Sequence, residues 1–147
     1  MVDTVKAEIS AFTGAEALWP LFAEGAGHIV GTSGAITTLA GLHLGLRRYD
    51  RNLVDGLWMT KRECEIVATR LASLTVEERA AEPCIGPDRA DLVLAGAAIL
   101  QGVQELWPSE RVRVADRGLR EGLLLSLMSR RRGVRSRRRR GGAGATR

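Results

Sequence analysis

Two glycines and two hydroxyl residues, Gly31, Thr32, Ser33 and Gly34, separate a short apolar run from a helical pattern. Glycine lets the backbone turn sharply and approach a ligand without a Cβ in the way, and the hydroxyl groups add donors. The helix predicted to follow brings unpaired N–H groups and the positive end of its dipole to the same point. The loop therefore fits a cradle for phosphate or a nucleotide; the alternative is an ordinary strand-to-helix turn with a serine N-cap. It holds no lysine, which excludes a Walker A site.

Arg89 is a second candidate for an anion contact. It lies between Asp88 and Asp91 on the first turn of a helix predicted over residues 88–106, with Asp88 as its N-cap. Because a cation at a helix start opposes the dipole, we expect Arg89 to have a partner, either a phosphate or a nearby carboxylate. His28 and His43 have no catalytic partner at a useful spacing, and we interpret both as structural.

Apolar periodicity predicts helices that alternate with strands. Helices are expected over residues 3–12, 33–46, 60–73, 75–83 and 88–106, and after residue 116 with Leu119, Leu123, Leu124 and Leu127 inside. Strands are expected over residues 28–31 and 111–115, with a marginal one at 54–59, and residues 13–27 are interpreted as a loop. This order indicates an α/β layered sheet that is rich in helix and has few strands.

Two further signals concern single helices. Thr60 with Glu63, and Thr75 with Glu78, have the spacing of a capping box at the start of a helix. Gly96 and Gly102 each cost the helix over 88–106 about 1 kcal/mol, which predicts the close approach of another backbone there.

Composition sets the broad class. The 147 residues are 45% hydrophobic, which indicates one soluble globular domain, and no apolar stretch is long enough to span a membrane. The two cysteines, Cys64 and Cys84, lack metal-ligand spacing, and we expect two reduced thiols in a cytoplasmic protein.

Residues 130–147 hold nine of the 22 basic residues and no acid, so 13 basic residues face 17 acidic ones elsewhere, a net charge of about −4. Such an Arg-rich tail repels itself and is expected to be disordered. It would bind a polyanion such as nucleic acid, polyphosphate or an anionic membrane, most densely at Arg137, Arg138, Arg139 and Arg140. The alternative is a solubilising or incidental extension.

Three stretches together carry a family resemblance: "VGTSGAITTLAGLHLGLRRYDRNLVDGLWM", "IGPDRADLVLAGAAIL" and "RVADRGLREGLLLSLM". In order and spacing they resemble the later part of the exopolyphosphatase/guanosine pentaphosphate phosphohydrolase (Ppx/GppA) family. Three motifs in register are far more specific than any single one, so they favour the phosphate interpretation of the loop. One departure is Ala35, where the family often has a threonine.

The resemblance implies a partial actin-like, ribonuclease H-like lobe of the ATPase type, from an enzyme with two lobes and a cleft. Members release the terminal phosphate of polyphosphate, or convert guanosine pentaphosphate to tetraphosphate, with a divalent cation that is usually magnesium. By this resemblance, residues 31–34 match the second-lobe loop that faces phosphate across the cleft. Arg89 matches the arginine of the "RAD" motif, a candidate for phosphate or nucleotide contact, and residues 117–121 match a motif expected to be structural.

The family's catalytic motifs have no counterpart in the sequence: neither the first lobe, with its phosphate loop and water-activating glutamate, nor the "DxGGGS" loop is found. Residues 1–129 are therefore expected to form part of the second lobe, with no catalytic residue or metal ligand identified and no activity of their own. The alternatives are a non-catalytic module that binds polyphosphate or nucleotide, and an inactive remnant. Expected partners are the substrate, the missing lobe or a second copy, and nucleic acid through the tail.

Deletion of residues 130–147 tests the role of the tail. We expect binding of the full chain to polyphosphate to fall steeply with salt, because each arginine–phosphate contact releases counterions. The deletion should remove most of that salt dependence in a titration at several salt concentrations. An unchanged affinity and salt slope would show that the tail is incidental.

Overall fold

The computed structural model describes residues 1–129, and the tail predicted from residue 130 onward lies outside them. The chain divides into two compact units, Met1–Asp116 and a second that begins at Arg117. The described part of the second unit contains a helix over residues 119–129. The division into 1–129 and 130–147 made from the sequence stays a prediction.

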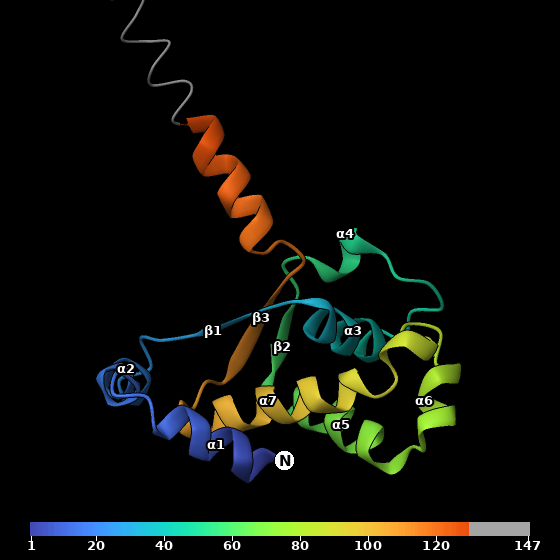
Figure 1. Cartoon of the computed structure of the whole chain (residues 1–147), viewed down its shortest axis with the longest axis horizontal. Coiled ribbons are helices and arrows are strands. Elements are labelled where there is room, and N and C mark those ends of the chain that lie inside the picture. Colours follow the sequence, from blue (N-terminus) through green and yellow to red (C-terminus); the bar gives the residue numbers. More distant parts are fainter. Residues whose placement is uncertain (130–147) are drawn as a thin grey trace, which may run out of the picture. The chain divides into compact units, whose positions relative to one another are not determined.

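Three strands form one sheet in the order β1-β3-β2 (Figure 1). β1 (Ile29–Thr32) pairs with β3 (Arg111–Ala115) in parallel, and β2 (Trp58–Thr60) pairs with β3 antiparallel. The "RVRVA" alternation puts Val112 and Val114, both 1% exposed, on the face that packs against helices. Arg111 and Arg113 are exposed, as alternation along a strand requires.

The helices of the first unit fall into two groups by length. The shorter ones are α4 (Arg51–Val54), α6 (Val76–Ala81) and the 3₁₀ turn η1 (Pro87–Arg89). The longer ones are α1 (Val2–Ser10), α2 (Ala15–Ala23), α3 (Gly34–His43), α5 (Lys61–Ser73) and α7 (Leu92–Leu106). None of the helices within residues 1–129 is long and apolar enough to cross a membrane.

α7 lies at the centre of the helical layer and packs against α1, α3 and α5 (Figure 1). Its two interior glycines make this possible. A Cβ on Gly96 would lie 2.3 Å from the Cβ of Ala35 on α3, and one on Gly102 would lie 2.9 Å from Val5 of α1. The close approach predicted from the two glycines is therefore confirmed.

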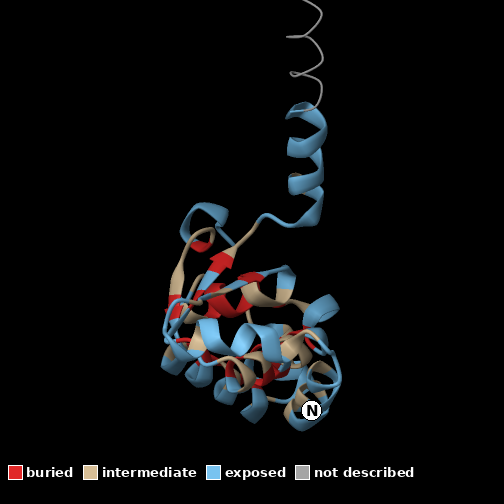
Figure 2. Ribbon diagram, turned by 90° about the vertical axis from the view of Figure 1, so that its left-hand side faces the viewer, coloured by how far each residue is buried: buried red, intermediate tan, exposed pale blue. Residues whose placement is uncertain are grey.

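The core lies where these helices meet the inner face of the sheet (Figure 2). Leu39 of α3, Met59 of β2, Leu71 of α5 and Val93 of α7 are each at most 2% exposed. Burying such side chains contributes about 1.5–3 kcal/mol each, which holds α3 and α7 on the sheet.

Several sequence predictions are confirmed. Both capping boxes form: the side chains of Thr60 and Thr75 accept from the backbone N–H of Glu63 and Glu78, whose carboxylates accept in return. The strands at 28–31 and 111–115 appear within one residue of their predicted bounds. The chain is a helix-rich α/β fold with few strands, as expected.

Other predictions are wrong. Residues 13–27 contain helix α2 despite Pro20, and the Trp107 indole N–H donates to the Ala15 carbonyl at the start of that helix. Asp88 lies in the 3₁₀ turn and does not cap the long helix, which begins only at Leu92 because Pro87 initiates a separate turn. Asp91 precedes α7 without a side-chain capping bond.

The last helix also differs from its prediction. Leu119, Leu123, Leu124 and Leu127 were expected inside, but each is at least 50% exposed. They belong to the second unit, whose described part is a single helix, and one helix offers no second layer against which to bury leucines.

A substitution at Gly96 tests the helix contact at the centre of the fold. Alanine there gains about 1 kcal/mol of helix propensity but inserts a methyl group into space held by Ala35, and such overpacking costs about 1–3 kcal/mol. Gly96→Ala should therefore lower the free energy of unfolding measured with urea. Gly122→Ala is the matched control, since nothing lies within 4 Å of its Cβ position, and it should not destabilise. Equal behaviour of the two variants would contradict the packing argument.

Candidate anion-binding site

The loop from β1 to α3 leaves the first turn of the helix open. Ser33 is the N-cap residue, but its side chain makes no capping hydrogen bond, so the alternative of a simple serine cap does not hold. Its backbone has φ 115° and ψ 166°, a region that only glycine visits easily, and such strain costs about 1–3 kcal/mol. The N–H groups of Gly34, Ala35 and Ile36 have no acceptor among residues 1–129, so three donors and the positive end of the helix dipole are available at this helix end.

Two buried threonines complete the loop from the inside. The Thr37 hydroxyl donates to the Ser33 carbonyl at 3.2 Å, and the Thr38 hydroxyl donates to the Gly34 carbonyl at 2.7 Å. These bonds give both carbonyl oxygens a side-chain donor, whereas the N–H groups of residues 34–36 have no acceptor among residues 1–129. Neither threonine was singled out from the sequence, although two hydroxyl residues one turn after a helix start can form this pattern.

Arg89 lies beside the same helix end. Its guanidinium carbon and one terminal nitrogen lie 3.6 Å from the Cβ position of Gly34, so a side chain at Gly34 would crowd it. A cavity of about 260 Å³ lies there, lined by Gly34, Ala35 and Thr38 of α3, by Arg89, and by Leu92 and Val93 of α7. Arg89 makes no hydrogen bond or ion pair through its side chain with any residue that the structure describes. The carboxylate partner considered as an alternative is therefore not found within residues 1–129.

The structure brings some of the predicted loop residues to this cavity but not all of them. Gly34 lines the cavity, and Ser33 precedes it in the loop. Thr32 is exposed on β1. Gly31 is buried, and a Cβ there would meet Ile36 at 2.8 Å, so packing against Ile36 explains this glycine without a ligand.

A cluster that sequence reasoning missed lies at the same edge of the sheet. The last pair in register is Thr32 with Ala115, so the chain leaves β1 and β3 side by side, with Asp116 next after β3. The Arg51 side chain donates to the Asp116 carboxylate at 2.5 Å, and the Asp55 carboxylate accepts from the Asp116 backbone N–H at 2.9 Å. Parallel strands place their carboxyl ends at the same edge of a sheet. If β1 and β3 had been predicted to be parallel neighbours, this rule would have indicated that Asp116 lies near the loop after β1.

The histidines and cysteines considered in the sequence analysis lie outside the cavity at Arg89. His43 lies 3.6 Å from a Glu63 carboxylate oxygen, and the ring of His28 packs edge-on against Trp58 at 5.4 Å. Cys64 and Cys84 are free, buried thiols. Arg137, Arg138, Arg139 and Arg140 lie outside the described residues.

Residues 1–129 do not gather three histidine, cysteine, aspartate or glutamate side chains that could hold a metal ion. Asp55 and Asp116 come together, but one accepts from the backbone and the other pairs with Arg51. The magnesium ion that the family resemblance implies therefore has no three-ligand cluster among residues 1–129.

The chain resembles known proteins over most of its length. The model of the Ppx/GppA phosphatase family matches residues 1–131. The crystal structure of the Aquifex aeolicus member of that family is 30% identical, with a TM-score of 0.68, and the match covers 80% of this chain and 40% of that one. None of the curated proteins matches the chain.

Two other solved structures are similar. An exopolyphosphatase-like protein is 27% identical with a TM-score of 0.71, and the match covers 88% of this chain and 43% of that one. An exopolyphosphatase from Cytophaga hutchinsonii is 20% identical with a TM-score of 0.64, covering 84% and 41%, and shares the fold. The chain thus spans about two-fifths of the length of these three structures.

Tyr49 reports on the Arg51–Asp116 cluster, because it is the single tyrosine in the chain. Burial, together with the neighbouring Asp116 carboxylate, raises its pKa to about 12 from 10.0. An absorbance titration of tyrosinate should find this midpoint, and Asp116→Asn should lower it. Tyr49 loses its hydroxyl proton at a lower pH in the unfolded chain than in the folded protein. The free energy of unfolding should therefore fall as the pH rises from about 10 to about 12. A midpoint near 10 in the folded protein would contradict this arrangement.

Proposed function

The chain belongs to the Ppx/GppA phosphatase family, and from this premise we propose that it binds the terminal phosphate of a phosphoanhydride at the first turn of α3. The substrate class is inorganic polyphosphate or guanosine pentaphosphate. The reaction that we propose for a complete enzyme with this lobe is hydrolysis of the terminal phosphoanhydride bond. The single observation that supports the site is the open first turn of α3 with the unpaired Arg89 guanidinium beside it.

The proposed role of each group follows from its charge and position. Three N–H groups of the first turn and the helix dipole attract a negatively charged oxygen. Arg89 supplies a planar cation that donates two parallel hydrogen bonds to one phosphate group. Neither group moves a proton, so this part of the protein binds and orients the phosphate and neutralises its charge.

Hydrolysis also requires a metal ion and an oriented water molecule. Magnesium would supply charge neutralisation in the complete enzyme, and residues 1–129 do not gather three His, Cys, Asp or Glu side chains that could hold it. In a second candidate function, the chain binds polyphosphate or nucleotide at the same helix end without cleaving it. An assay of phosphate release from polyphosphate with added magnesium distinguishes the two functions, because only the hydrolase releases phosphate. We propose a cytoplasmic location for either function.

Nuclear magnetic resonance of the full chain with tripolyphosphate tests the site. We expect the backbone amide signals of Gly34, Ala35 and Ile36 to shift on addition, because these N–H groups would donate to the ligand. Arg89→Gln should weaken the binding read from these signals by about 1–3 kcal/mol, the range for a charge-assisted hydrogen bond.

Arg62→Gln is the matched control, since Arg62 is an exposed arginine on α5 that does not line the cavity. It removes the same charge and should leave the shifts unchanged. Because the amide signals report the loop alone, binding by the Arg-rich tail does not interfere. If the first turn of α3 shows no shift, or if Arg89→Gln and Arg62→Gln behave alike, the proposed site is wrong.

A further inference from the structure

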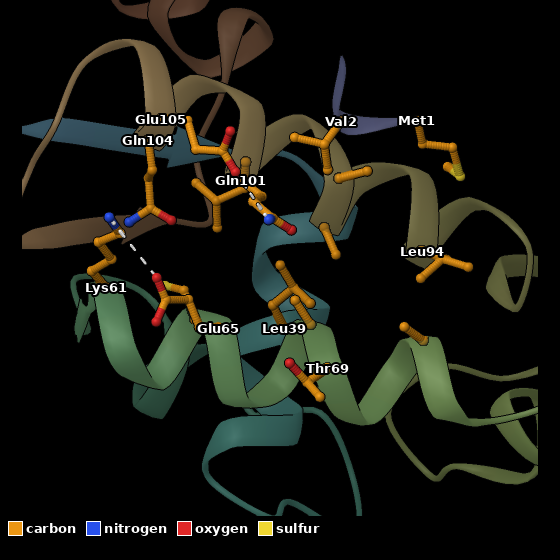
Figure 3. A pocket seen from close by; sticks show the side chains of 16 residues that line it. Met1, Val2, Leu39, Lys61, Glu65, Thr69, Leu94, Gln101, Gln104 and Glu105 are labelled. Atoms are coloured by element: carbon orange, nitrogen blue, oxygen red, sulfur yellow. Dashed lines mark hydrogen bonds and ion pairs between the residues drawn. The ribbon is translucent and has the colours of Figure 1, made fainter. Parts of the chain in front are cut away.

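α5 and α7 leave a cavity of about 750 Å³ along the seam between them (Figure 3). The lining extends on α5 from Lys61 to Ala72 and on α7 from Leu94 to Glu105. Side chains therefore fill this seam incompletely. The position at which α7 begins depends all the more on contacts beyond the seam, and Arg89 lies just before that start.

Arg79 of α6 supplies such a contact. The residue is only 7% exposed, although arginine is rarely buried. Its Nη1 atom donates to the carbonyl oxygens of Leu71, at 3.1 Å, and Leu74, at 2.7 Å. Its Nε atom donates to the carbonyl oxygen of Ala90 at 2.9 Å. Three backbone carbonyls are thus its hydrogen-bond partners within residues 1–129.

The bonds from Nη1 and the bond from Nε have different consequences. Leu71 belongs to the last turn of α5, and Leu74 is the C-cap residue of that helix. A cation there satisfies carbonyls that the helix leaves unpaired and matches the negative end of its dipole, so the Nη1 bonds stabilise the end of α5. The Nε bond instead joins the end of α5 to Ala90, the residue directly after Arg89.

The turn that carries Arg89 has weak hydrogen bonds of its own. The backbone N–H groups of Arg89 and Ala90 close the 3₁₀ turn η1 with bonds of 3.3 and 3.4 Å, longer than the usual range of about 2.7–3.2 Å. Among residues 1–129, the bond from Arg79 is the only side-chain hydrogen bond that reaches residues 86–91. Ala90 is 1% exposed whereas Arg89 is exposed, so this bond holds the backbone inward at Ala90 while Arg89 stays at the surface.

We propose that Arg79 is a positioning residue for the phosphate site: by holding the Ala90 carbonyl, it keeps the Arg89 guanidinium beside the first turn of α3. The inference rests on the proposed function, in which Arg89 and the helix end contact the phosphate. Arg79 itself does not line the cavity at Arg89 and acts only through its neighbour. A binding group that is held in place before the ligand arrives loses less freedom on binding, so affinity depends on the residue that holds it.

Arg79→Lys separates the two kinds of bond. Lysine has a methylene where arginine has Nε, and its ammonium follows that methylene. The variant therefore keeps the charge and a donor for the end of α5, but it loses the donor to Ala90. We expect Arg79→Lys to weaken the binding of tripolyphosphate to the full chain about tenfold, read from the amide signals of the first turn of α3 in a nuclear magnetic resonance titration.

A double-mutant cycle with Arg89→Gln determines whether Arg79 acts through Arg89. Arg79→Lys should weaken binding in the wild-type background but have no further effect in the Arg89→Gln background, because the group that it positions is then absent. Gly102→Ala is the control for lost stability. A Cβ there would meet Val5 of α1 at 2.9 Å, far from the lining of the cavity at Arg89, so this variant should lower the free energy of unfolding and leave tripolyphosphate binding unchanged.

The backbone amide of Arg89 gives a readout without ligand. Its heteronuclear Overhauser effect, which falls as the backbone becomes mobile, should fall in Arg79→Lys and keep the wild-type value in Gly102→Ala. Arg79→Met fills the same space without any donor, and it takes the place of the lysine variant if that variant does not fold.

The outcomes separate this inference from the proposed function. Wild-type affinity in the Arg79 variant, an unchanged Overhauser effect at Arg89, or an equal loss of affinity in the Arg89→Gln background would each overturn the positioning role and leave the phosphate site intact. If Arg89→Gln itself binds tripolyphosphate like the wild type, the phosphate site is wrong, and the positioning role fails with it.

Discussion

The close approach of α3 and α7 at Gly96 and Ala35 is the contact on which the rest of the fold depends. With only 2.3 Å between the Cβ of Ala35 and a Cβ position on Gly96, the two helices meet almost backbone to backbone. This places the first turn of α3 beside the segment that carries Arg89 into α7. The first turn of α3 and the Arg89 guanidinium belong to segments about 55 residues apart in the chain. They line one cavity because Gly96 has no side chain to hold α7 away from Ala35 of α3.

Hydrogen bonds within the loop before α3 leave the N–H groups at the start of this helix without acceptors. Thr37 and Thr38 satisfy the loop carbonyls from the buried side, so the N–H groups are the ones left over. Ser33 holds a backbone conformation that favours glycine, and the surrounding packing must compensate for that strain. Strained positions and unsatisfied donors concentrate where a ligand completes them, and this loop has both.

The two cavities of the first unit differ in the chemistry of their lining. The one at Arg89 combines a helix N-terminus with a cation, so it attracts negative charge. The one between α5 and α7 is lined mostly by small and apolar side chains, and its Lys61 and Glu65 form an ion pair. The six residues that line the first cavity include one cation, Arg89, and no carboxylate.

The sequence by itself determined what depends on neighbouring residues. The capping boxes at Thr60 and Thr75 are fixed by local hydrogen bonds. The alternation of "RVRVA" and the glycine loop before α3 are likewise patterns of neighbouring residues that can be recognised in the sequence. It also pointed to Arg89 as a cation in need of a partner. Only the tertiary structure decided that Ile36 packs against Gly31 and that Arg51 pairs with Asp116. It also decided that the Gln104 amide nitrogen is buried without an acceptor among residues 1–129. Each of these depends on which distant segments pack together, and no local pattern encodes the identity of a neighbour across the core.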